Sequence, residues 1–401
     1  MKFLHSFSFL LLINLILINS VSAQSGWETL APLPNPPGVA TMASVNGKIY
    51  ILSGSGSALG AQANTYMYDP ETNEWSQKAK IPQACYWATA NASNGKIYVM
   101  GGGHPYPGKS YNFIYDPITD SWSSGDTLLT PRMYHSSAEL NGKIYLIGGQ
   151  NGNPVEYYFD EYDTQTNQWT RKENNLHNMA WYCSLASLGN KIYRIGGGGA
   201  PNFVTTYFES FDTENNSWTQ LPDMKTKFHA SVALTYNNKM YLIGGNANGV
   251  DSDTIFGYYP EIEEWVPELI KLPQPRVYHR GVICDDYIYI YGGQNTQSDP
   301  IEGSLIRMHL GGSDVKINEN EQNIRIFPNP SNGIFYIDLH SSLNLQADIK
   351  LFDLFGNIID CKIEPGSENQ IVVTTNNIEK GLYFVKISNS NFVKVLKVII
   401  N

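Results

Sequence analysis

A ten-residue phrase recurs with variations six times along the 401-residue chain, and it constrains the fold more than any other feature. One copy reads NGKIYVMGGG from Asn94, and in five of the six copies the apolar stretch ends in a glycine pair. The first glycines are spaced by 47, 47, 48, 48 and 48 residues, at Gly54, Gly101, Gly148, Gly196, Gly244 and Gly292. A repeat of this length indicates an array of similar structural units.

These glycines do not form a phosphate-binding loop. Such a loop leads from a strand into the N-terminus of a helix. Here the glycines lead into sequences such as HPYPGKSYNF from His104, which cannot begin a helix. A nucleotide site would also occur once rather than six times. The glycines therefore belong to the architecture of the repeat.

Each repeat predicts four short strands. An Asn-Gly or similar pair before the KIY segment is typical of a two-residue hairpin turn, so the strand before this turn pairs with the strand after it. A third strand ends in an aromatic residue that precedes a tryptophan by seven residues, as in YDPITDSW from Tyr115 to Trp122. Asp and Pro between these two aromatics supply the turn into the fourth strand.

The combination of glycine pair, aromatic residue and tryptophan at fixed distances resembles the kelch repeat over roughly 27–310. The resemblance implies a β-propeller, in which four-stranded blades surround a central channel. A single blade cannot bury both of its faces alone and must stack on its neighbours.

The tryptophans predict how the ring is completed. Six of them share the repeat register, at Trp27, Trp75, Trp122, Trp169, Trp218 and Trp265. The first precedes the first glycine position, and the sixth repeat has no tryptophan unit of its own. We therefore expect the segment from Trp27 to supply the fourth strand of blade six, which removes a free sheet edge. The predicted fold is an all-β, six-bladed kelch-type propeller closed by an N-terminal strand and followed by a small C-terminal β-sandwich.

The chain begins with the pattern of a secretory signal peptide. Residues 1–23 combine Lys2, the apolar run Phe9–Ile18 and the small residues SVSA before Gln24. The apolar run is too short for a stable membrane span, and we expect no span in the mature chain. We assign the propeller to 24–310, a polar linker to 311–323 and the β-sandwich to 324–401.

The last segment resembles the C-terminal sorting domain of the type IX secretion system of Bacteroidetes. The matching pieces are FPNPSNG from Phe327, LFDLFGNII from Leu351, KGLYFVKI from Lys380 and the terminal VKVLKVII. Leu382 departs from the pattern, since Ile or Thr is common there. The resemblance implies Sec export, then passage through the type IX machinery to the cell surface or medium. An unrelated structural or adhesion module with the same topology is the alternative.

Charge and cysteine content narrow the range of partners. The formal net charge of −10 argues against nucleic acid or an anionic membrane as partner. Cys85, Cys183, Cys284 and Cys361 lie far apart, with no CxxC pair, and support neither a zinc site nor a disulfide framework, although a secreted chain could oxidise one pair. We expect no metal and no cofactor.

The candidate ligand-binding residues gather on one face of the ring. In an antiparallel hairpin the segment before the first strand lies beside the loop after the second, so both belong to the channel mouth. The candidates there are Trp87, His104, Arg132, Tyr134, His135, Gln150, Trp181, Tyr182, Asn202, His229, Asn246, Arg276, Tyr278, His279, Arg280 and Gln294. Aromatic faces among amide, Arg and His donors suit a sugar. The alternative is that the repeated Arg and His residues pack within each blade.

We interpret the chain as a secreted recognition protein that binds a carbohydrate or protein ligand at the channel mouth. No GxSxG or HExxH motif is present, and the sequence assigns no catalytic residue. The alternative is a carbohydrate-active enzyme similar to the six-bladed sialic acid mutarotases and epimerases, or a lyase.

In such an enzyme, Arg132, Arg276 or Arg280 would hold a carboxylate, and a histidine or Glu156 would move a proton. The seven-bladed copper radical oxidases, which also resemble kelch proteins, fit less well because this chain lacks a seventh blade. A purely structural surface protein is a third alternative.

Overall fold

The computed structural model describes residues 26–55, 60–104, 107–151, 158–172, 181–199, 203–260, 263–268, 270–295, 303–310, 324–339, 348–353, 358–366, 370–375, 378–388 and 393–401. The expected signal peptide, 1–23, and the expected linker, 311–323, lie outside these ranges. Within them the regular elements are all β-strands, as predicted.

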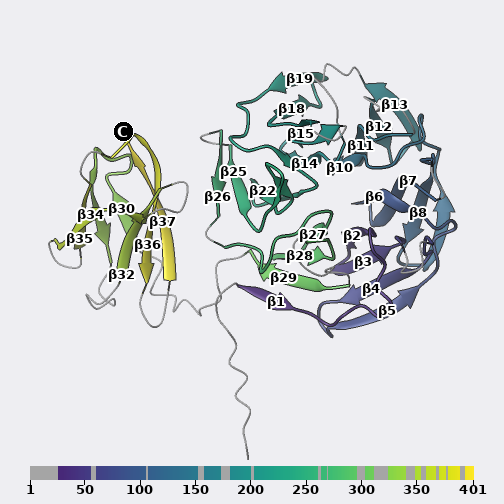
Figure 1. Cartoon of the computed structure of the whole chain (residues 1–401), viewed down its shortest axis with the longest axis horizontal. Coiled ribbons are helices and arrows are strands. Elements are labelled where there is room, and N and C mark those ends of the chain that lie inside the picture. The colour runs from purple at the N-terminus through teal and green to yellow at the C-terminus, as the bar shows by residue number, and fades with distance from the viewer. Residues whose placement is uncertain are drawn as a thin grey trace, which may run out of the picture.

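Six four-stranded antiparallel sheets form a ring, with the first strand of each sheet near the centre and the last at the rim (Figure 1). Blade one contains β2 (Thr41–Val45), β3 (Lys48–Leu52), β4 (Thr65–Asp69) and β5 (Glu74–Lys78). Blade two contains β6 (Tyr86–Ser93), β7 (Lys96–Gly103), β8 (Asn112–Asp116) and β9 (Ser121–Ser124). Blade three contains β10 (Ser136–Leu140), β11 (Lys143–Ile147), β12 (Phe159–Asp163) and β13 (Gln168–Lys172).

The remaining blades follow the same order. Blade four contains β14 (Ser184–Leu188), β15 (Lys191–Ile195), β18 (Phe208–Asp212) and β19 (Ser217–Gln220). Blade five contains β21 (Val232–Tyr236), β22 (Lys239–Ile243), β25 (Ile255–Tyr259) and β26 (Glu264–Pro267). Blade six contains β27 (Arg280–Cys284), β28 (Tyr287–Tyr291), β29 (Leu305–His309) and β1 (Trp27–Thr29).

Blades four and five each carry a small additional sheet, formed largely by the segment between their second and third strands. One pairs β16 (Gly198–Gly199) with β17 (Phe203–Val204). The other joins β20 (Phe228–His229), β23 (Asn246–Ala247) and β24 (Val250–Asp251). These additions follow the glycine pairs, so they enlarge the face on which the candidate residues lie.

The hairpin turns between the first two strands have the predicted geometry. In blades one to three the turn residues are Asn-Gly pairs, and both residues have positive φ, for example 54° at Asn141 and 79° at Gly142. Positive φ at both central residues is what a type I′ turn requires, and Asn and Gly are the residues that tolerate it best. These short turns all lie on the face opposite the glycine pairs.

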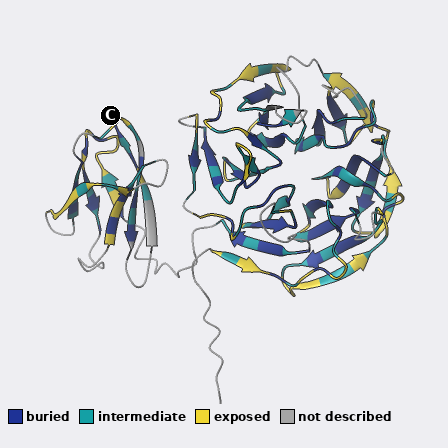
Figure 2. Ribbon diagram, in the orientation of Figure 1, coloured by how far each residue is buried: buried dark blue, intermediate teal, exposed yellow. Residues whose placement is uncertain are grey.

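The repeated aromatic residues pack within and between blades. Tyr115 lies directly across from Trp122, and their ring centroids are 5.0 Å apart. The indole nitrogen of Trp122 donates a hydrogen bond of 2.8 Å to the carbonyl oxygen of Ala79, which follows the last strand of the preceding blade. Trp75 and Trp169 make the same bond in their own blades. Buried residues fill the blade interfaces, and exposed ones concentrate on the outer strands (Figure 2).

Strand β1 occupies the outer position of blade six. Its residues pair with β29 in the register Trp27↔Met308, Glu28↔Arg307 and Thr29↔Ile306. The indole nitrogen of Trp27 donates a 2.7 Å hydrogen bond to the carbonyl oxygen of Lys271, beside blade five, as Trp75, Trp122 and Trp169 do with their preceding blades. Tyr68 and Ile49 of blade one share a buried cluster with Tyr289 of blade six.

The C-terminal residues form two further four-stranded sheets that share one core. The first contains β30 (Arg325–Phe327), β31 (Ile334–Asp338), β35 (Gln370–Thr375) and β34 (Cys361–Pro365). The second contains β33 (Ile358–Ile359), β32 (Asp348–Phe352), β36 (Gly381–Ser388) and β37 (Val393–Ile400). Phe335 and Val373 from one sheet and Val385 and Val398 from the other are fully or nearly fully buried together. The sequence also predicts a hairpin turn at Gly356 and Asn357, and these two residues lie outside the described ranges.

All four cysteines are free, and Cys85, Cys183 and Cys284 are buried. Burial raises the pKa of the Cys85 thiol to about 11, so it stays protonated and unreactive at neutral pH. In the part of the chain that the structure describes, no helix has the length and apolar character needed to cross a membrane.

The role of β1 can be tested by truncation. A chain that begins at Leu33 loses this strand, the Trp27 hydrogen bond and the cover on one edge of β29, so we expect a lower melting temperature and a less cooperative transition. Thermal unfolding followed by circular dichroism measures both. A chain that begins at Gly26 is the matched control. Equal melting of the two chains would show that β1 does not contribute to the stability of the propeller.

Candidate ligand-binding site

One backbone contact at the start of each blade builds the channel mouth. The residue two positions after each first glycine, or one position after it in blade one, pairs with a residue just before the first strand or, in blade two, with the first residue of that strand. The pairs are Gly38↔Ser55, Tyr86↔Gly103, Met133↔Gln150, Trp181↔Gly198, His229↔Asn246 and Val277↔Gln294. The expectation that these segments share one face is therefore confirmed.

The residue after each of these pairs has a left-handed backbone. We call these the six mouth residues: Val39, Trp87, Tyr134, Tyr182, Ala230 and Tyr278. Their φ values lie between 47° and 61°. Residues with side chains larger than that of glycine adopt this region rarely, and a large aromatic residue pays about 1 kcal/mol or more to occupy it.

Four of the six mouth residues form an aromatic cluster, consisting of Trp87, Tyr134, Tyr182 and Tyr278. The ring of Trp87 lies 4.9 Å from Tyr134, 5.6 Å from Tyr182 and 5.4 Å from Tyr278, measured between centroids. Tyr182 lies 5.2 Å from Tyr134 and 5.0 Å from Tyr278. Rings expected to line a rim around the mouth thus converge on one another, and each remains partly exposed.

Main-chain hydrogen bonds connect these residues from blade to blade. The N–H groups of Tyr134, Tyr182, Ala230 and Tyr278 each donate to the carbonyl oxygen of the mouth residue in the preceding blade, over 2.9 to 3.4 Å. The positive φ turns each peptide group toward its neighbour around the channel. The rings are therefore held by a backbone that is itself fixed.

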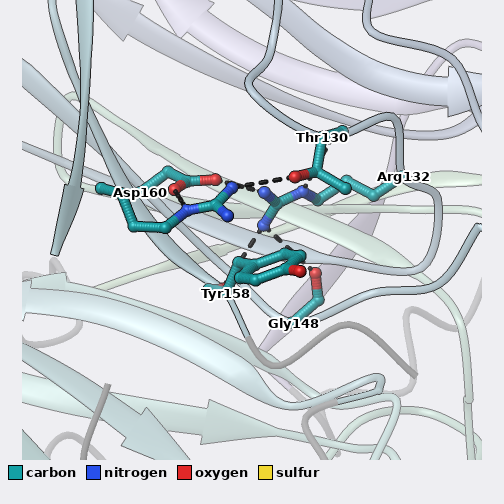
Figure 3. Close-up of polar contacts among 6 residues, drawn as sticks. Thr130, Arg132, Gly148, Tyr158 and Asp160 are labelled. Carbon is teal, nitrogen blue, oxygen red and sulfur yellow. Dashed lines mark hydrogen bonds and ion pairs between the residues drawn. The ribbon is translucent and has the colours of Figure 1, made fainter. Parts of the chain in front are cut away.

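The repeated arginine of blade three does not face the mouth. Arg132 is fully buried and forms an ion pair with Asp160 of β12, also buried (Figure 3). It also donates to the carbonyl oxygens of Thr130, Gly148 and Tyr158. Asp160 accepts a second bond, of 2.9 Å, from Arg171. These contacts tie the first strand of the blade to its second and third strands.

Arg276, at the matching position of blade six, has a different environment. It is also buried and donates to the carbonyl oxygen of Gly292 and to the Ser304 hydroxyl, both over 3.0 Å. Asp160 in blade three and Ile306 in blade six each lie opposite the same position of the second strand of their own blade. Ile306 therefore takes the place of Asp160 in blade six. Burial lowers the Arg276 pKa to about 10.

The repeated histidines are buried between blades. His135 and His279 lie against the first glycine of the preceding blade, where a Cβ added to Gly101 or Gly244 would collide with the imidazole. Burial, and then the positive charge of the repeated arginine, lowers the pKa of each to about 3. His135 contacts the Thr89 hydroxyl at 3.1 Å. Both imidazoles are neutral at physiological pH.

The remaining candidates are spread around the mouth. Trp181 is partly buried and is the residue that pairs with Gly198, one position before Tyr182. It is therefore not part of the aromatic cluster. Burial lowers the pKa of His229, and Asp251 opposes this shift. Asn246 donates a 3.0 Å bond to Asp251. His104 lies 5.7 Å from the ring of Tyr86, Gln150 is partly buried, and Gln294 is exposed. Asn202 lies outside the described residues.

Beneath the aromatic cluster the channel contains a cavity of 160 Å³, lined by the first strand of every blade. Arg280, the first residue of β27, lines it and is partly exposed. Of the three arginines proposed to hold a carboxylate, Arg280 is the one that reaches this cavity. Among the described residues, no three His, Cys, Asp or Glu side chains are grouped as metal ligands would be.

Sequence comparison gives two family matches. Residues 39–231 match a KLHDC2/KLHL20/DRC7 kelch-repeats domain. Residues 325–401 match a secretion system C-terminal sorting domain. The protein is a kelch-repeat propeller with a C-terminal type IX sorting domain.

Individual relatives of the kelch protein match it over shorter stretches. An N-acetylneuraminate epimerase from Yersinia enterocolitica is 32% identical over 94 residues, or 21% of this chain and 24% of the relative. The kelch repeat and BTB domain-containing protein 12 of Danio rerio is 32% identical over 90 residues, or 20% of this chain and 14% of the relative. The matches thus span about a quarter and a seventh of these curated relatives.

A solved structure extends the comparison to the fold. The structure titled "Structure of YjhT" superposes with a TM-score of 0.57 at 19% identity, over 69% of this chain and 96% of that one. This similarity supports the kelch propeller as the fold. The sorting domain places the kelch protein among exported proteins, at the cell surface or outside the cell.

The buried histidines make stability depend on pH. An unfolded histidine has a pKa near 6.5, and the folded values of His135 and His279 are about 3, so the unfolded chain binds more protons between these limits. The contribution of these histidines to the free energy of unfolding is complete above pH 6.5. It falls as the pH decreases toward 3, by up to about 1.4 kcal/mol per pH unit for each histidine. Urea unfolding between pH 6.5 and 5 measures the slope.

Two variants identify the source of this slope. The double variant His135→Gln with His279→Gln should show a smaller pH dependence than the unmodified chain. His309→Gln, on the outer part of blade six, is the control and should keep the full slope. An unchanged slope in the double variant would contradict the assignment.

Proposed function

We propose that the kelch protein is a secreted recognition protein whose propeller binds a carbohydrate or protein ligand at the channel mouth. The observation that carries this proposal is the aromatic cluster on left-handed backbone at Trp87, Tyr134, Tyr182 and Tyr278. This backbone occurs in all six blades, but four of the blades place a large ring on it, where such side chains are disfavoured. Glycine or asparagine there would relieve the strain.

The chemistry of the cluster suits a ligand with an apolar face and polar edges. Aromatic rings stack on the C–H faces of sugars and on apolar or proline side chains. The hydroxyls of the three tyrosines supply hydrogen-bonding groups. Because the rings pack on one another, they lose little side-chain freedom when a ligand binds, which favours affinity.

The two faces of the ring differ in a way that supports the mouth as the binding face. The opposite face consists of short two-residue turns that are nearly the same in every blade. The mouth face carries the added sheets β16–β17 and β20–β23–β24, which differ between blades. Loops that vary on a rigid scaffold are where binding residues usually lie.

A sugar epimerase or mutarotase is a second candidate. The observation that favours it is the 94-residue match to an N-acetylneuraminate epimerase. In this hypothesis Arg280 would hold the substrate carboxylate, since Arg132 is already paired with Asp160 and Arg276 is buried away from the cavity. Glu156, the proposed proton carrier, lies outside the described residues. Epimerisation assayed by NMR on sugars that bind would distinguish enzyme from binder.

A glycan array on the purified chain tests the proposal and supplies the ligand for a mutational test. The double variant Trp87→Ala with Trp181→Ala removes one ring from the cluster and one beside it. Stacking on such rings adds about 0.5 to 1.5 kcal/mol each, so affinity for an array hit should fall about ten-fold or more. Isothermal titration calorimetry measures the affinity, and circular dichroism confirms folding.

The control for this experiment changes the opposite face. Asn141→Ala with Lys143→Ala alters the blade-three turn and should leave affinity within two-fold. Full affinity in the tryptophan variant, together with loss of affinity in the turn variant, would place the ligand on the turn face and contradict the proposal.

Export is tested separately from binding. We propose that 324–401 is the sorting unit and that the propeller folds without it, since the two sheets of this segment have a core of their own. A chain that ends at Leu310 should stay in the periplasm of a type IX-competent host, and cell fractionation with immunoblotting locates it. Wild-type amounts of the shortened chain outside the cell would refute the assignment.

A further inference from the structure

We propose that the central channel binds a small monoanion, a halide or a short carboxylate, at the guanidinium group of Arg280. Three observations support this site. A cationic side chain lines a cavity of the channel, no acidic side chain pairs with it among the described residues, and hydroxyl groups line the same cavity. This inference does not depend on the ligand proposed for the mouth.

Arg280 differs from the arginines of the propeller that form ion pairs. Its Nη1 donates 3.3 Å and 3.2 Å hydrogen bonds to the carbonyl oxygens of Tyr278 and His279, its own neighbours in the chain. By contrast, Arg132 pairs with Asp160, Arg194 with Glu209 and Arg307 with Glu28. Arg276 also lacks an acid but points to Gly292 and Ser304 instead of the cavity. Arg280 is thus the cation that faces the channel without a counter-charge.

The groups around Arg280 do not supply a negative charge. His135 and His279 are neutral, because burial holds their pKa values at about 3. Burial also raises the pKa of Tyr182 far above neutral pH, so its hydroxyl stays protonated. Arg132 is compensated by Asp160. Arg280 itself, with its pKa lowered by burial to about 10, remains charged at pH 7.

A charge that is partly removed from bulk water without a counter-charge is unfavourable, and in proteins such a charge is normally paired. Since no carboxylate of the described chain reaches Arg280, an anion from solution is the remaining partner. The guanidinium group is well suited to this role, because its N–H groups bind halides and carboxylates in its plane.

Hydroxyl groups complete the environment. Ser137 lines the cavity and accepts a hydrogen bond from Asn91, so its own O–H is left to donate to another acceptor. Donors of this kind with one guanidinium favour a monoanion over phosphate, which would bring more charge than one cation compensates. A volume of 160 Å³ fits a small anion with a few waters.

The Arg280 cavity adjoins a second cavity on the side away from the mouth. A second channel cavity, of 390 Å³, lies toward the hairpin turns and shares lining residues with the first, including Ser137, Ala233 and Gly281. At the mouth end, the aromatic cluster lines the Arg280 cavity. We therefore place the entrance of the anion at the turn face, so changes of the mouth loops should leave it intact.

Thermal melting of the full mature chain in matched salts tests the proposal. Sodium chloride and sodium acetate are the probes, and sodium sulfate, a dianion that one guanidinium does not compensate, keeps the ionic strength constant. We expect a saturable rise in Tm with chloride, acetate or both, of about 5 °C at one hundred times the Kd. Equal Tm values in all three salts would overturn the proposal.

Two variants locate the effect. Arg280→Met removes the charge while keeping much of the side-chain length, and it should abolish the saturable rise. Arg307→Met, in the same blade but paired with Glu28 at the rim, is the matched control and should keep it. A rise of full size in Arg280→Met would place the anion elsewhere and refute the site.

A second measurement avoids substitution altogether. Crystals of the unmodified chain soaked in sodium bromide should show an anomalous peak within hydrogen-bonding distance of the Arg280 guanidinium. Bromide peaks found only at the outer surface would count against the proposal, even if Arg280→Met fails to fold.

Discussion

Contact between a blade and the glycine pair of the blade before it, as at the pairs of blades two, four and five, is the constraint on which the packing of the ring depends. The second glycine donates a main-chain hydrogen bond to the next blade: Gly102 to the carbonyl oxygen of Arg132 over 2.9 Å, and Gly245 to that of Arg276 over 2.7 Å. A Cβ on Gly101 would come within 2.7 Å of the Arg132 carbonyl oxygen, and one on Gly244 within 2.9 Å of the Arg276 oxygen. Side chains there would push the blades apart, so the glycines recur for a packing reason.

The regular part of the fold was predictable because it is encoded locally. Asn-Gly pairs specify the hairpin turns, and the seven-residue distance from Tyr115 to Trp122 specifies a cross-strand aromatic pair. The position of Trp27 predicted the place of β1 beside β29, because only blade six lacked a fourth strand in the sequence. Each of these features repeats, and repetition gives six chances to detect it.

The mouth was only partly predictable, because its geometry depends on backbone conformation. The sequence placed Trp87 and Trp181 in one class, as tryptophans outside the repeat register. In the structure Trp87 has positive φ and enters the aromatic cluster, whereas Trp181 is in the bridging position one residue earlier in its blade. An alignment of the blades would have separated them. The sequence analysis did not predict the ion pairs of Asp160 and Glu209, although acids at the position where other blades have an aromatic residue were a usable signal.

The main-chain hydrogen bonds between mouth residues have an evolutionary consequence. Tyr134, Tyr182, Ala230 and Tyr278 hold the preceding blade through their peptide groups, and their side chains take no part in these bonds. Mutation can therefore exchange a tyrosine for an alanine, as blade five illustrates, without breaking the link between blades. A propeller built in this way can acquire a new specificity by point substitution at the mouth while its ring remains unchanged.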